Sequence, residues 1–109
     1  MVARPKMKPL DQANFYNKDQ SWYMKQHFEY KERKLRFIIR RNAYDFQSSA
    51  IVQIQDPSNL AWLGLGSIPY TQMKSEACYA FKDLARGVSK PLTFLEDLRA
   101  LQDIAKMLI

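Results

Sequence analysis

Residues 31–41 have the sequence KERKLRFIIRR, and the spacing of its apolar residues decides how the chain folds. Leu35, Phe37 and Ile39 occupy every second position, and most of the positions around them are basic. Such alternation is typical of a β-strand that buries one face and exposes the other. A helix would leave Phe37 off the stripe that holds Leu35 and Ile39. Dense aromatic and β-branched residues favour strands over residues 24–41, with a helix as the alternative.

The segments on either side extend this strand into a sheet. Phe28 and Tyr30 have the opposite parity to Leu35, which predicts a hairpin that turns near Glu32–Lys34. Residues 44–55, YDFQSSAIVQIQ, alternate again.

Asp56-Pro57-Ser58-Asn59 has the residues of a type I turn, and a short apolar strand follows at Leu60–Gly66. The sequence thus predicts a small antiparallel sheet of three to four strands over about residues 24–66.

The last third of the chain has helical spacing. We expect one helix at about 71–86, with Thr71 as its N-cap and Gly87 just beyond its end, and a second at about 93–108. The apolar stripe of the second helix comprises Phe94, Leu98, Leu101, Ala105 and Leu108. The predicted fold class is α+β, a small sheet followed by two C-terminal helices packed on one of its faces.

The second predicted helix is apolar beyond its main stripe. Leu95, Ile104, Met107 and Ile109 need a second covering surface. The first helix, a partner chain or a second copy would each supply one, so the sequence allows a homodimer through the C-terminal helix.

The chain of 109 residues has the length of one domain. We predict a partly ordered arm at residues 1–20 and a single α+β domain at residues 21–109. Pro5 and Pro9 disfavour an early helix in the arm, while its aromatic residues Phe15 and Tyr16 suggest that it docks on something.

Several classes of function find no support in the composition. His27 and Cys78 are the only histidine and cysteine, whereas structural zinc needs four ligands and nucleophilic catalysis needs a base beside the nucleophile. We therefore expect neither a metal, a cofactor nor an enzyme. With one cysteine, no secretory leader and no apolar run that would span a bilayer, we expect a cytoplasmic protein with no membrane partner.

The positive charge is concentrated in one part of the chain. Residues 1–41 carry eleven Lys/Arg and four Asp/Glu, a net of +7, whereas residues 42–109 carry six and seven, a net of −1. This asymmetry favours a nucleic acid or an acidic protein surface as the partner.

The basic strand itself is the predicted binding site. Its cations are Lys31, Arg33, Lys34, Arg36, Arg40 and Arg41, and the aromatic residues expected to stack on bases are Phe28, Tyr30 and Trp22. Lys34, Arg36 and Arg40 share one face of a strand, where spacings of about 6.6 Å per two residues can follow a phosphate backbone. A charged groove with stacking rings binds single strands without strong sequence preference.

The same pattern has other interpretations. A solvated sheet face also carries Lys and Arg, because such residues protect edge strands from aggregation. The alternative function is a small protein-binding inhibitor or adaptor, for example phage- or plasmid-encoded, that docks a basic and aromatic face on a host nucleic-acid-handling complex. It would use the aromatic arm as an anchor. No signature of a known nucleic-acid-binding motif decides between these hypotheses.

Overall fold

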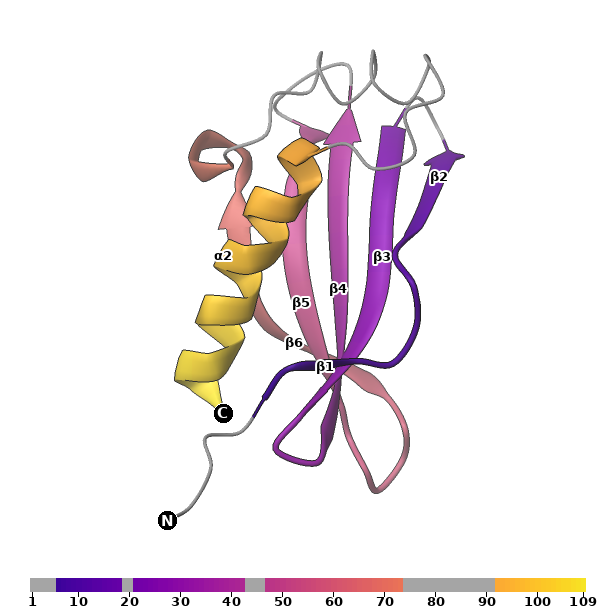
Figure 1. Ribbon diagram of the computed structural model, residues 1–109, viewed down its shortest axis with the longest axis vertical. Helices are drawn as coiled ribbons and strands as arrows, with labels where there is room; N and C mark the ends of the chain where they lie inside the picture. The colour runs from indigo at the N-terminus through magenta and orange to yellow at the C-terminus, as the bar shows by residue number, and fades with distance from the viewer. Residues whose placement is uncertain (1–5, 19–20, 43–46, 74–91) are drawn as a thin grey trace.

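A computed structural model of the chain describes residues 6–18, 21–42, 47–73 and 92–109. It has two layers, an antiparallel sheet and a single long helix (Figure 1). The strands are β1 (Lys8–Pro9), β2 (Asn14–Lys18), β3 (Ser21–Tyr30), β4 (Arg33–Asn42), β5 (Ser49–Gln55) and β6 (Trp62–Pro69), and the helix is α2 (Leu92–Leu108). The order across the sheet is β3-β4-β5-β6, and both β1 and β2 pair with β3 on its other side.

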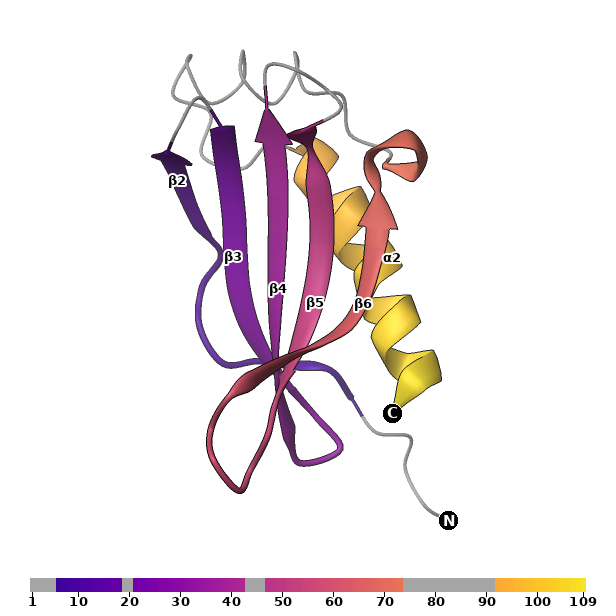
Figure 2. The same cartoon turned by 180° about the vertical axis from the view of Figure 1, so that it is seen from behind.

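Helix α2 crosses one face of the sheet, and the core lies between these two layers (Figure 1). The alternation of Leu35, Phe37 and Ile39 has the predicted effect, since all three are fully buried on this side of β4. The other buried apolar residues are Met24, Phe28, Tyr30, Ala50, Val52, Ile68, Phe94, Leu98, Leu101 and Ala105. Figure 2 shows the opposite face of the sheet, which α2 does not cover.

Strands β3 and β4 form a long hairpin with a two-residue turn. Tyr30 pairs with Arg33, so the turn residues are Lys31 and Glu32, slightly before the predicted position at Glu32–Lys34. Both have positive φ, 50° and 63°, as a type I′ turn requires. That turn favours Asn-Gly, and the side chains of Lys31 and Glu32 make it strained.

The predicted turn at Asp56–Asn59 is present between β5 and β6. The Asp56 carboxylate accepts hydrogen bonds from the Ser58 amide at 2.9 Å and from the Ser58 hydroxyl at 2.7 Å, which lowers the pKa of Asp56. The strand after it is longer than predicted and runs through Ile68 to Pro69.

A β-bulge interrupts the pairing of β5 with β6. Val52 pairs with Gly66 and Gln53 pairs with Gly64, which leaves Leu65 as the extra residue. On the side of β6 that faces α2, a Cβ placed on Gly66 would lie 2.7 Å from Cγ2 of Ile104. A glycine is therefore required for α2 to pack this closely against the strand.

The fold class is α+β as predicted, but its details differ from the prediction. Within the described residues, the sheet has six strands rather than three or four. Residues 14–18, which belong to the predicted partly ordered arm, pair along their whole length with β3, and the arm as a separate unit stays a prediction. The second predicted helix is α2, whereas Tyr70–Gln72 form a 3₁₀ turn and Met73 is extended, so no α-helix begins at Thr71. The rest of the first predicted helix lies outside the described residues.

The end of α2 is apolar and exposed. Met107 and Leu108 have 83% and 57% of their surface accessible, although Leu108 belongs to the predicted stripe. A homodimer through this helix stays a prediction. Among the described residues, the structure has no helix that is both long and apolar enough to cross a membrane.

Candidate nucleic-acid interface

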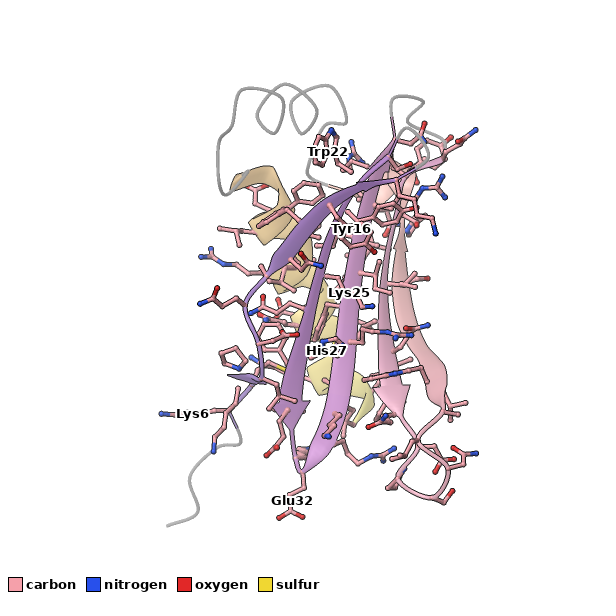
Figure 3. The ribbon with its side chains drawn as sticks, turned by 90° about the vertical axis from the view of Figure 1, so that its right-hand side faces the viewer. Lys6, Tyr16, Trp22, Lys25, His27 and Glu32 are labelled. Carbon is pink, nitrogen blue, oxygen red and sulfur yellow. The ribbon has the colours of Figure 1, made fainter. Side chains whose placement is uncertain are left out.

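The sheet surface opposite α2, here called the open face, carries basic and aromatic side chains. Residues paired directly across antiparallel strands point to the same side, so the register defines its members. They include Tyr16, Tyr23, Lys25, His27, Lys34, Arg36, Ile38, Arg40, Ile51, Gln53 and Trp62. In Figure 3, Tyr16, Lys25 and His27 follow one another along β2 and β3.

One group on the open face, the Trp62 cluster, comprises Trp62, Arg36, Gln53 and His27. The Arg36 guanidinium lies 4.5 Å from the centroid of the Trp62 ring, a cation–π contact. Its Nε donates a hydrogen bond to Oε1 of Gln53 at 2.7 Å, and the His27 and Trp62 rings are 5.7 Å apart. The hydrogen bond and the ring contact together fix the position of the Arg36 guanidinium on the open face.

Asp11 fixes His27 from the edge of the sheet. Its Oδ1 accepts the His27 backbone N–H at 2.8 Å, and its Oδ2 lies 2.7 Å from Nδ1 of the ring. Burial alone would raise the pKa of Asp11, but the backbone and side-chain hydrogen bonds of His27 together lower it below its usual value. Asp11 is therefore ionised at neutral pH and orients the imidazole beside Trp62.

A second group, the tyrosine cluster, comprises Tyr16, Tyr23 and Arg40. The two phenol rings stack with centroids 4.9 Å apart and an interplanar angle of 6°. The Arg40 guanidinium lies 5.9 Å from the Tyr23 ring, and its Nε donates to Oγ of Ser21 at 3.0 Å. Burial, and then the neighbouring Tyr23, raise the pKa of Tyr16, so this phenol stays neutral.

The two clusters lie at a spacing that suits an extended strand. Arg40 and Arg36 are four residues apart on β4, which corresponds to about 13 Å. Between them lie half-buried Ile38 and Ile51, with Lys25 beside Ile38. The arrangement has an arginine and aromatic rings at each end, with two isoleucines and Lys25 between them.

The predicted cations divide between the two faces. Lys34, Arg36 and Arg40 lie on the open face, as their spacing predicted. Arg33 and Arg41 have the opposite parity and lie on the side of α2, where Arg41 is only 2% exposed. Lys31 is in the hairpin turn and donates to the backbone oxygen of Ile109 at 2.9 Å.

The aromatic residues predicted to stack lie on the side of α2. Phe28 and Tyr30 are buried in the core, and Phe28 packs edge to face against Phe37 with centroids 5.2 Å apart. Trp22 has the same parity and is half-buried. None of the three lies on the open face.

The rings that do lie on the open face, Tyr16, Tyr23 and Trp62, were not predicted as site residues. The parity of Tyr23 with Lys25 would have placed it there once β3 was extended to Ser21. The spacing of residues in β6 did not place Trp62 on the open face. The extra residue Leu65 changes which face the residues before it point to, relative to those after it.

Comparison with known proteins finds no matching family model, no similar curated protein and no similar solved structure. The function is therefore argued from the residues of this chain alone.

Proposed function

We propose that this chain is a non-enzymatic nucleic-acid-binding module that holds a single strand on its open face without strong sequence specificity. The observation that carries the proposal is the pairing of each open-face arginine with an aromatic ring. Arg36 lies against Trp62 and Arg40 beside Tyr23. Guanidinium groups bind phosphates, and partly exposed rings such as these stack on bases of any sequence.

The charge of the open face supports an anionic ligand. Its strand cations are Lys8, Lys18, Lys25, Lys34, Arg36 and Arg40, and Glu29 is the acidic residue among its described strand positions. A flat sheet with flanking rings suits unstacked bases better than a duplex, whose bases are already stacked on one another. The single cysteine agrees with a reducing compartment, so we place this binding in the cytoplasm.

The test compares two pairs of substitutions with equal effects on net charge. Arg36→Gln with Arg40→Gln removes two cations from the open face. Arg99→Gln with Lys106→Gln removes two exposed cations from α2, on the other side of the sheet. Binding is measured by fluorescence anisotropy with labelled single- and double-stranded oligonucleotides, and folding by thermal unfolding.

We expect the parent to prefer the single strand. Binding by the open-face variant should be at least about tenfold weaker, because each lost charge-assisted hydrogen bond is worth about 1.5–3 kcal/mol. The α2 variant should bind nearly as the parent does. If both variants lost the same affinity, only net charge would matter and the assignment of the open face would be wrong.

A protein partner is the alternative, and the same rings and arginines would serve it as interface anchors. Deletion of residues 1–20 would not separate the two hypotheses, because it removes β2 and the contact of Phe15 with Phe94, whose rings are 5.8 Å apart. Instead, loss of oligonucleotide binding together with an Arg36-dependent pull-down of an acidic protein would favour the inhibitor or adaptor.

A further inference from the structure

The bulge between β5 and β6 has an open hollow of about 350 Å³ beside it. It is lined by Ile51, Val52, Gln53, Gly64, Leu65, Gly66 and Ser67. Ile51, Gln53, Gly64 and Ser67 belong to the open face by their pairing, so the hollow opens on the side of the candidate interface. Its volume is at the lower end of the range for small-ligand sites, which suits a ligand of one or two rings.

The walls of the hollow suit a flat, partly polar ring. The side chain of Ile51 and the bare backbone at Gly64 and Gly66 allow close approach. The extra residue of a bulge leaves backbone groups outside the ladder, and these can hydrogen-bond to a ring edge. Gln53 and Ser67 are the polar residues of the lining.

The hollow is also adjacent to the Trp62 cluster. Gln53 belongs to both, because its Oε1 accepts a hydrogen bond from Nε of Arg36 at 2.7 Å and the same residue lines the hollow. A ring in the hollow would therefore have a fixed guanidinium beside it. That combination, an open hollow of mixed polar and apolar lining next to a cation, fits a planar ring joined to an anion.

We propose that this hollow binds one nucleobase, with the phosphate attached to it beside Arg36. The inference rests on the function proposed above, and it adds a defined subsite to a surface that otherwise binds through charge and stacking. The bound unit belongs either to a strand or to a free nucleotide, and the chemistry of the contact is the same for both.

Gly64 allows the hollow to be filled without disturbing the fold. A Cβ at this position meets no atom within 4 Å, and the position faces the hollow. Gly64→Leu should occlude the subsite, and Gly64→Ala should fill it only in part. Gln72→Leu adds the same side chain at an exposed position of the Tyr70–Gln72 turn, outside both the hollow and the strands, and serves as the control.

The experiment uses thymine oligonucleotides of about 12 nucleotides, within the site sizes of single-strand-binding domains, and abasic oligonucleotides of the same length. Thymidine monophosphate is the free-nucleotide probe. The parent should bind the thymine strand more tightly than the abasic one. Gly64→Leu should reduce this preference at least about fivefold, the lower value for one stacked base, while binding of the abasic strand stays unchanged.

Each result of this experiment either supports the subsite or overturns it. If Gly64→Leu keeps the full preference for bases, the hollow is not a base site, while the function of the open face still stands. If the parent binds neither oligonucleotide, both proposals fall. A graded loss from Gly64→Ala to Gly64→Leu with none in Gln72→Leu supports the subsite. Competition by thymidine monophosphate would identify free nucleotides as a second source of the ligand.

Discussion

Gly66 lies where α2 packs directly against β6, and a substitution there tests how α2 sits on the sheet. We consider the substitution Gly66→Ala, which adds one methyl group on the helix side of β6. The new Cβ would lie 2.7 Å from Cγ2 of Ile104, whereas carbon atoms pack at about 3.5–4.0 Å. The helix or the strand must therefore move by close to an ångström, since Cγ2 of a β-branched residue is near its backbone.

Overpacking of this kind costs about 1–3 kcal/mol. The lower chain entropy of alanine in the unfolded state offsets about 0.4–1 kcal/mol, so a net loss of about 1–2 kcal/mol is expected for Gly66→Ala. Gly64→Ala is the matched control, two residues away on the same strand. Its Cβ meets nothing within 4 Å, so only the entropic gain of about 0.4–1 kcal/mol applies.

Urea unfolding followed by tryptophan fluorescence measures both variants, and the free energies of unfolding are compared with that of the parent. The order of stability should be Gly64→Ala, parent, Gly66→Ala. If Gly66→Ala were as stable as Gly64→Ala, α2 would not pack against Gly66 of β6 as described.

Two further predictions concern the hairpin and the edge of the open face. Glu32→Gly should stabilise the chain by about 0.5–1 kcal/mol, because glycine removes the strain of positive φ at this position, and unchanged or lower stability in urea unfolding would argue against the I′ turn. Asp11 has a lowered pKa in the folded chain, so its contribution is present above its ordinary pKa of 3.8 and is lost as the pH falls through the folded value. Asp11→Asn should therefore lower the free energy of unfolding near neutral pH by about 0.5 kcal/mol, a small amount because the pair is partly exposed. In strong acid the variant and the parent should have the same thermal midpoint. An equal difference at both pH values would contradict this linkage.

The sequence predicts the strands best where one face is buried. Leu35, Phe37 and Ile39 alternate because β4 is central and packs under α2, and the same holds for Ala50 and Val52 on β5. The helix stripe was equally clear, since Phe94, Leu98 and Leu101 all reach the core. Periodicity carries this information because burial acts on each residue in turn.

The edges of the sheet were harder to predict. Strand β2 is short and polar, and only Phe15 marks the face that reaches the core, through its contact with Phe94. The identities of Lys31 and Glu32 do not indicate a type I′ turn, which favours Asn-Gly. The pairing of the strands on either side imposes the positive φ values at these two residues. Tertiary pairing decides such positions, and local sequence does not.

Three of the six predicted cations lie on the open face, and their alternation along the strand was enough to place them there. Lys34, Arg36 and Arg40 alternate with buried residues and lie on the open face, but Arg33 and Arg41 are one residue out of phase and lie on the side of α2. The aromatic residues could not be assigned in the same way. Trp62 meets Arg36 across two strand pairings and a bulge, a long-range juxtaposition that no spacing in the sequence encodes.

The salt dependence of binding tests the central claim most directly. Affinity for a labelled single strand is measured over a series of salt concentrations for the parent, for Arg36→Gln with Arg40→Gln, and for Arg99→Gln with Lys106→Gln. Each phosphate contact contributes about 0.7 to the slope of log affinity against log salt, so the open-face variant should lose about 1.4 from the slope and the α2 variant almost nothing. Equal slopes for the two variants would contradict the claim that the open face binds the phosphate backbone.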